Sequence, residues 1–179
     1  MLELALHILD IVENSTQAGA TLVCIAVTED LERDVLTIEI KDDGHGMDQE
    51  QLGKVFDPFY TTKEVRRIGL GLPLLYQATQ QCDGHFEIES QEGEGTRICA
   101  EFRHSHIDRQ PVGDMAGVIT ALIAGNPCVD FVYWHRNADR SSVFDTREIR
   151  KEIENIPINH PEILNFIRTN IKEKLNEIG

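Results

Sequence analysis

The chain has 179 residues, 41% hydrophobic and 27% charged, which is enough for one well-packed core and ordinary for a globular protein. Its formal net charge of −14 argues against nucleic acid or an anionic membrane surface as the main partner. No run approaches the roughly 18 apolar residues of a membrane helix, and the first residues lack the basic start of a signal peptide. The cysteines form no C-x-x-C pair, which favours reduced thiols in a cytoplasmic compartment.

The first part of the chain predicts alternating helices and strands. Apolar residues at helical spacing predict a helix over residues 3–17. Two β-rich stretches, 21–28 and 35–40, flank a polar turn and predict a hairpin. Asp48, with Gln51 three residues later, predicts the capped start of a short helix. The other elements predicted before residue 104 are the body of that helix over 48–55, a loop over 57–71, a helix over 73–81, and strands over 86–90 and 96–103.

The stretch 104–114 is polar and contains Pro111 and Gly113, so we place a domain boundary there, between residues 1–103 and 104–179. The second part is expected to be a small α+β extension continuous with the first. Its predicted elements are a helix over 115–124 capped by Asp114, a strand over 129–134, a helix over 146–155 opened by a capping box of Asp145 and Glu148, and a last helix opening near Pro161.

The last helix has an apolar stripe at four-residue intervals, formed by Ile163, Ile167, Ile171 and Leu175. Monomeric proteins rarely leave a large contiguous apolar patch exposed. We therefore expect this helix either to fold back on the strand at 129–134 or to pair with another subunit, which makes a homodimer one of the two possibilities.

Polar residues share one face of the first helix. His7, Asp10 and Asn14 lie one turn apart on a helix that otherwise packs through apolar side chains. An asparagine can ligate Mg²⁺ through its amide oxygen, and an aspartate can accept a proton. A solvated helix face is the simpler explanation of this segment taken alone.

The segment Asp42-Asp43-Gly44-His45-Gly46-Met47 follows a predicted strand. A carboxylate at a strand end can accept a hydrogen bond from the exocyclic amine of a base, and glycines allow close backbone approach. Met47 would supply a soft apolar wall. Taken alone, Asp and Gly at these positions would indicate an ordinary turn.

The segment Phe56-Asp57-Pro58-Phe59-Tyr60-Thr61-Thr62-Lys63 is followed by cations and a pair of glycines. Lys63, Arg66 and Arg67 stand just before Gly69-Leu70-Gly71-Leu72, which leads into a predicted helix. Cations and free N–H groups at such a turn favour bound phosphate. A fourth segment, Gly93-Glu94-Gly95-Thr96, precedes the last strand of the first part and would alone indicate a hairpin turn.

These four segments, in this order within about 100 residues, resemble the ATP-binding domain of histidine kinases, mismatch-repair ATPases, gyrase B and Hsp90-type chaperones. The resemblance covers residues 1–103 and implies a two-layer α/β sandwich that binds ATP and Mg²⁺. It implies that Asn14 holds the metal, Asp10 is the general base, and Asp42 and Thr96 read adenine. The other nucleotide-binding residues that it implies are Gly44, Gly46, Met47, Lys63, Arg66, Arg67, Gly69, Leu70, Gly71 and Leu72.

The resemblance leaves three functions open. The phenylalanine-rich segment is of the histidine-kinase type, and only 13 residues precede Asn14, so no phosphoacceptor hairpin fits there. This favours a kinase that phosphorylates a separate partner protein. An ATP-gated binding switch with little turnover is the alternative. The string Val12-Glu13-Asn14-Ser15-Thr16-Gln17-Ala18-Gly19-Ala20-Thr21 is similar to mismatch-repair ATPases, although the acidic charge disfavours a DNA-acting machine. His104, His106 and His135 suggest a metal site only weakly, because exposed or core histidines explain them more simply.

Overall fold

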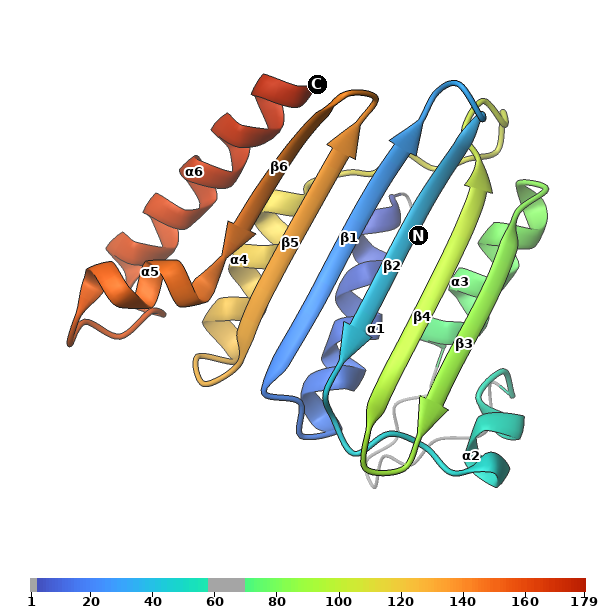
Figure 1. Ribbon diagram of the computed structural model, residues 1–179, viewed down its shortest axis with the longest axis horizontal. Coiled ribbons are helices and arrows are strands. Elements are labelled where there is room, and N and C mark those ends of the chain that lie inside the picture. Colours follow the sequence, from blue (N-terminus) through green and yellow to red (C-terminus); the bar gives the residue numbers. More distant parts are fainter. Residues whose placement is uncertain (1–2, 58–69) are drawn as a thin grey trace.

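The computed structural model describes residues 3–57 and 70–179. Its centre is a six-stranded sheet in the order β3-β4-β2-β1-β5-β6 (Figure 1). The strands are β1 (Leu22–Asp30), β2 (Val35–Asp42), β3 (His85–Gln91), β4 (Gly95–Arg103), β5 (Asp130–Asn137) and β6 (Arg140–Asp145). The helices are α1 (Leu4–Gln17), α2 (Gln49–Lys54), α3 (Gly71–Gln81), α4 (Met115–Gly125), α5 (Thr146–Ile153) and α6 (Pro161–Ile178).

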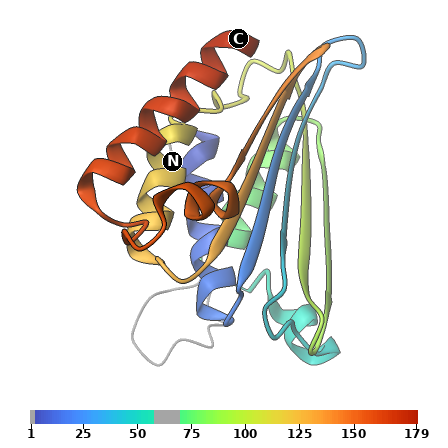
Figure 2. The ribbon, with the colours of Figure 1, turned by 60° about the vertical axis from the view of Figure 1, so that its left-hand side comes forward.

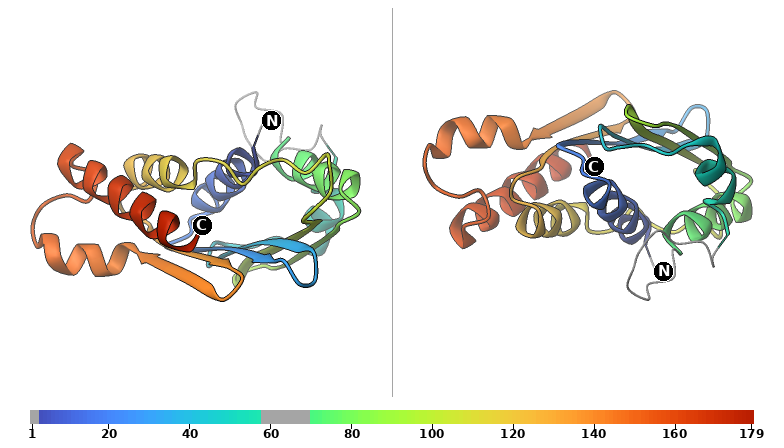
Figure 3. Two further views of the ribbon diagram at one scale, coloured as in Figure 1. Left: turned by 90° about the horizontal axis from the view of Figure 1, so that it is seen from above. Right: turned by 90° about the horizontal axis from the view of Figure 1, so that it is seen from below.

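Helices cover one face of the sheet and leave the other open, as Figures 2 and 3 show. The helices α1, α3, α4 and α6 form the second layer, in which α1 packs between α3 and α4, and α6 packs on α4. The fold is therefore the two-layer α/β sandwich that the sequence predicts. Alternation along the strands explains the layering, since every second residue of β1, such as Val23, Ile25 and Val27, is buried toward the helices.

Strands from both parts of the chain pair in this one sheet. The predicted hairpin of β1 and β2 is confirmed as an antiparallel pair, and β5 adds to the other side of β1 in parallel. A single buried cluster includes Ile8 of α1, Ile119 of α4 and Ile171 of α6. Residues 104–179 thus extend the same sheet and core, and the division at residue 103 stays a prediction.

Three details differ from the sequence predictions. The helix α3 begins at Gly71, two residues before Pro73, because proline is tolerated anywhere in a first turn. The strand β6 was not predicted at all, since its sequence is largely polar. Asp145 does cap α5, by accepting from the Arg147 N–H at 2.9 Å, but Glu148 pairs with Lys151 in place of completing a capping box. The capping box of Asp48 and Gln51 at α2 is confirmed.

The apolar stripe of α6 belongs to the core. Ile167 and Ile171 are fully buried, and Ile163 and Leu175 pack against the same cluster. The helix lies on α4 and reaches β5 and β6, so the first of the two expected arrangements is confirmed.

Replacing Ile167 by alanine should lower the free energy of unfolding by about 2–4 kcal/mol, because it removes buried methyl groups and leaves a cavity. The neighbouring Phe166 is 52% exposed, so Phe166→Ala should change that free energy by less than about 1 kcal/mol. Urea denaturation of both variants checks the difference. Equal losses would place the stripe of α6 outside the core.

One carboxylate ties the two parts of the chain together at the far end of β1. Glu29 accepts hydrogen bonds from Nε2 of His135 on β5 and from Nε2 of His104, which directly follows β4, each at 2.9 Å. The hydroxyl of the buried Tyr133 lies 2.7 Å from Nδ1 of His135. The bond from His135 is the main reason that the pKa of Glu29 falls from 4.5 to about 2; burial opposes that shift and His104 supports it.

A depressed pKa in the folded state makes stability fall in acid. Glu29 should contribute fully to the free energy of unfolding above about pH 5 and lose this contribution as the pH drops toward 2. The contribution should be about 1–2 kcal/mol after allowing for solvent screening. Glu29→Gln should remove this part of the pH dependence. Chemical denaturation of both proteins from pH 6 to pH 3 tests it, and parallel stability curves would show that the His104 and His135 contacts do not hold the carboxylate ionised.

Candidate functional site

Three elements meet where α1 ends. The strands β2 and β4 pair so that Asp42, the last residue of β2, lies directly opposite Thr96. Ser15 of α1 donates its hydroxyl to Oδ2 of Asp42 at 2.5 Å. The C-terminal half of α1 and the ends of two central strands therefore enclose one polar site at the edge of the core.

Asp42 is held in a fixed orientation. Its side chain is buried, with the residue only 7% exposed, and Oδ1 accepts the N–H of Gly44 at 2.9 Å. An ionised carboxylate has about four acceptor positions, and the described residues fill two of them. Asp42 can therefore still accept a hydrogen bond from a ligand's amine.

The adjacent Asp43 has a structural role. Its carboxylate accepts from the N–H and the hydroxyl of Thr21, at 2.7 and 2.6 Å, and from the Leu22 N–H at 2.9 Å. Burial alone would raise the pKa of Asp43, but these bonds outweigh it and lower the pKa. Asp43 thus fastens the segment after β2 to the start of β1, and the two aspartates differ in function.

Ser90 of β3 organises the far side of the site. Its Oγ donates to the Gly95 carbonyl at 3.0 Å and accepts the Met47 N–H at 2.9 Å. Because its single proton is used there, the 2.8 Å contact with Thr96 is best made by the Thr96 hydroxyl donating to Ser90. The oxygen of Thr96 then keeps acceptor capacity beside Asp42, and Met47 is fixed at the margin.

Close backbone contacts explain three glycines of these motifs. A Cβ on Gly46 would lie 2.0 Å from the Gln91 carbonyl oxygen, and Gly46 has a φ of +67°. A Cβ on Gly95 would lie 2.1 Å from the Asp42 carbonyl oxygen. Both glycines thus bring the turn between β3 and β4 against the end of β2, and Gly44 sits close to Ala18 in the same way, with a Cβ 3.0 Å from the Ala18 carbonyl oxygen.

Asp10 and Asn14 lie one turn apart on α1, the helix that also carries Ser15. A Cβ on Gly71, the first residue of α3, would lie 3.2 Å from Cβ of Asp10, so the two helices approach closely there. Within residues 3–57 and 70–179 neither side chain makes a hydrogen bond or ion pair. Two polar side chains with no described hydrogen bond, on the helix that holds Asp42 through Ser15, suit a polar ligand.

The structure describes only some of the predicted phosphate-binding residues. Leu70, Gly71 and Leu72 form the start of α3, with Leu70 exposed and Leu72 packed against the core. Lys63, Arg66, Arg67 and Gly69 lie outside the described residues. Phe56, just before that segment, contacts Tyr76 of α3 and Phe86 of β3 at ring distances of 4.9 and 5.6 Å.

Sequence reasoning missed Ser15 and Ser90. Ser15 is four residues after Ile11, so it belongs to the buried face of α1, and a serine among apolar positions is the signal that could have found it. Ser90 gave no such signal, because its place beside Thr96 depends on the pairing of β3 with β4.

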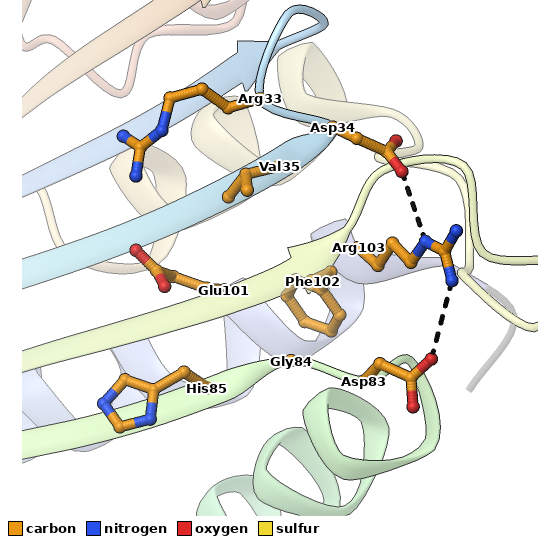
Figure 4. A pocket seen from close by; sticks show the side chains of 9 residues that line it. All are labelled: Arg33, Asp34, Val35, Asp83, Gly84, His85, Glu101, Phe102 and Arg103. Atoms are coloured by element: carbon orange, nitrogen blue, oxygen red, sulfur yellow. Dashed lines mark hydrogen bonds and ion pairs between the residues drawn. The ribbon is translucent and has the colours of Figure 1, made fainter.

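A groove of about 360 Å³ lies at the opposite end of the sheet, away from Asp42 (Figure 4). Arg103 crosses it with ion pairs to Asp34 and Asp83 at 3.2 and 3.8 Å. The groove is open, and these charged groups pair with one another. We therefore place the functional site at the end of α1, where the polar groups converge, and not in this groove.

Removing the Ser15 hydroxyl should loosen the site. Ser15→Ala takes a donor from a buried carboxylate, which should lower the free energy of unfolding by about 1–3 kcal/mol. Ser15→Thr keeps a hydroxyl and is the matched control. Thermal denaturation of both variants gives the comparison, and equal stability of Ser15→Ala and the natural protein would mean that Asp42 does not need this bond.

Comparison with known proteins agrees with this geometry. Residues 2–106 match the model of the family described as histidine kinase-, DNA gyrase B-, and HSP90-like ATPase. The chain therefore belongs to this family of ATP-binding domains. The matched range includes α1, the ends of β2 and β4, and α3.

Bacterial kinases are among its relatives. The chain is 44% identical over 66 residues to sporulation kinase E of Bacillus subtilis, a match that covers 37% of the chain and 9% of the kinase. It is 46% identical over 59 residues to sporulation kinase C of the same organism, covering 33% and 14%. It is 33% identical over 89 residues to sensor histidine kinase ZraS of Escherichia coli, covering 50% and 19%. The chain thus spans less than a fifth of the length of each of these kinases.

A solved structure shares the fold beyond the family match. The crystal structure of the N-terminal domain of a DNA repair protein superimposes with a TM-score of 0.59 at 16% identity, covering 80% of this chain and 52% of that one. At this identity the likeness concerns the fold alone. Among the described helices, none has the length and apolar character needed to cross a bilayer.

Proposed function

We propose that this protein is a cytoplasmic ATP-dependent kinase that phosphorylates a separate partner protein. The observation that supports this most is the site itself, where Ser15 binds a fixed Asp42 to α1, the helix that also carries Asp10 and Asn14. In this proposal Asp42 accepts from the adenine amine. Thr96 supplies the second polar contact at that edge.

Asn14 suits a metal that accompanies ATP. Mg²⁺ prefers oxygen ligands and keeps several waters, so one amide oxygen together with phosphate oxygens is a fitting set. The Asn14 side chain has no other partner among the described residues. When bound, Mg²⁺ would neutralise phosphate charge, while Asn14 fixes where that charge is held.

Asp10 is the proposed general base. It lies one turn before Asn14, is half-buried, and its carboxylate makes no hydrogen bond or ion pair with the described residues. A base must reach the acceptor's proton, and in this proposal the Asp10 carboxylate, near the start of α3, does so. Asp10 would take the proton of the partner's hydroxyl or imidazole as the phosphoryl group leaves ATP.

Incubation of the purified protein with γ-labelled ATP and a lysate of the source organism tests the proposal. We expect label on a second protein, and markedly less of it at low ATP concentration when Asp42→Asn replaces the natural protein. Partner capture that changes with nucleotide but transfers no label would instead support an ATP-gated switch. If label is not transferred and capture does not depend on nucleotide, both functions are contradicted.

A further inference from the structure

Three polar side chains form one row across the sheet, on the face that the helices cover. Ser90 of β3 lies opposite Thr96 of β4, and Thr96 lies opposite Asp42 of β2. The three strands are neighbours in the sheet (Figure 1). Directly opposite residues of antiparallel strands have Cβ atoms about 4.5–5.5 Å apart. The Thr96 side chain is therefore flanked by Ser90 and by Asp42.

The next row on this face is apolar and closes the core behind the polar row. It consists of Ile88, Ile98 and Ile40. Two of its members, Ile98 and Ile40, are buried. The polar row is thus the point where the core ends and the nucleotide site begins, and the direction of each hydrogen bond in it decides what the site offers to a ligand.

The contacts of Ser90 allow only one arrangement of protons in which all of them are hydrogen bonds. Its Oγ lies 3.0 Å from the Gly95 carbonyl oxygen, 2.9 Å from the Met47 nitrogen and 2.8 Å from Oγ1 of Thr96. A serine hydroxyl donates one proton and accepts with two lone pairs. The carbonyl can only accept and the N–H can only donate. Ser90 must therefore donate to Gly95, and the Thr96 hydroxyl must donate to Ser90.

We infer that Ser90 is a positioning residue that makes Thr96 an acceptor toward the bound base and so selects a base with an exocyclic amine. The inference rests on the proposed contact of Asp42 and Thr96 with adenine. An ionised carboxylate also only accepts, so the two groups side by side offer acceptors alone. An amine has two N–H groups to give them. A keto oxygen at the same position would meet two acceptors and form no hydrogen bond with either.

Ser90 is needed for this selectivity because a hydroxyl can otherwise adapt. A threonine hydroxyl that is free to rotate accepts from an amine or donates to a keto oxygen equally well. The bond to Ser90 removes the second possibility, because the one proton of Thr96 is already used. Sites that leave buried polar groups unpaired reject a wrong ligand far more strongly than sites that discriminate by size.

Calorimetry with Mg-ATP and with Mg-inosine triphosphate tests the inference on the full chain. Inosine triphosphate has a keto oxygen where ATP has the amine. The natural protein should prefer ATP by about tenfold or more. Ser90→Ala should lower this preference by about three- to tenfold, because the Thr96 hydroxyl can then turn its proton toward the keto oxygen. Ser90→Thr keeps a hydroxyl and should restore the preference.

Two controls separate positioning from a purely structural role. In a Thr96→Val background, Ser90→Ala should no longer alter the preference, since Ser90 acts through the Thr96 hydroxyl. Ser105→Ala removes a serine hydroxyl that donates to Asp34 at 2.7 Å, at the other end of the sheet, and should leave the preference unchanged. Ser90→Cys, which has nearly the same size and a weak hydrogen-bonding group, serves if Ser90→Ala does not fold.

The outcomes are distinct for the inference and for the proposed kinase. Equal losses of affinity for both nucleotides in Ser90→Ala would overturn the inference and leave Ser90 as a support of the turn. A change of preference that persists in the Thr96→Val background would overturn it as well. Failure to transfer label to a partner would contradict the kinase but not the preference, and a natural protein that binds neither nucleotide would contradict both.

Discussion

Asp42→Asn is expected to weaken ATP binding by tenfold or more. The substitution keeps the size of the side chain but removes the charge that accepts the adenine amine, and it turns one acceptor into a donor. Losing a hydrogen bond to a buried charged group costs roughly 1.5–3 kcal/mol, which sets that fold-change. Isothermal titration calorimetry with Mg-ATP on the variant and the natural protein gives the two affinities.

Asp43→Asn is the matched control for this substitution. Asp43 is the next residue, has the same side chain, and is bonded to Thr21 and Leu22. Its substitution should lower stability and leave the affinity for ATP within about threefold. Equal affinities for Asp42→Asn and the natural protein, or a larger loss in Asp43→Asn, would refute the adenine role of Asp42.

Asp10→Asn is expected to reduce phosphoryl transfer to the partner by about 10² to 10⁴, because it removes the group that accepts the proton. Binding of ATP should change little, since Asp10 is assigned no contact with the base. The separation between transfer and binding is what distinguishes a base from a residue that only supports the helix. Transfer is measured with γ-labelled ATP, and binding by calorimetry on the same preparation.

Glu13→Gln provides the comparison on the same helix. Glu13 lies one residue before Asn14 and outside the face shared by Asp10 and Asn14. Its substitution should leave transfer within a few fold of the natural protein. Full transfer by Asp10→Asn would exclude Asp10 as the base. A drop in the ATP affinity of Asp10→Asn that matches its drop in transfer would assign Asp10 to binding.

Local signals allowed the sequence to predict most elements. The helix α1 follows from apolar spacing, the β1–β2 pair follows from two β-rich runs around a polar turn, and Asp48 and Asp114 cap the helices that follow them. Each of these depends on residues within a few positions of one another, so a single sequence contains the information.

The features that the sequence did not predict depend on contacts between residues far apart in the chain. The polar strand β6 has little β-propensity of its own and is an edge strand that depends on β5, with the Val143 carbonyl accepting from Lys174 of α6 at 2.7 Å. The Ser15–Asp42 bond joins residues 27 positions apart, and the Glu29–His135 bond spans 106. Such contacts follow from how helices and strands pack, which the residue pattern of each element does not specify.

Amide hydrogen exchange with and without Mg-ATP tests the central claim most directly, because it locates the nucleotide on the unmodified protein. We expect slower exchange in the C-terminal half of α1 and in the backbone near residues 42–47 and 95–96 when Mg-ATP is bound. Exchange in β5 and β6 should be unchanged. Protection confined to the groove at Arg103, or no change at either end of the sheet, would contradict it.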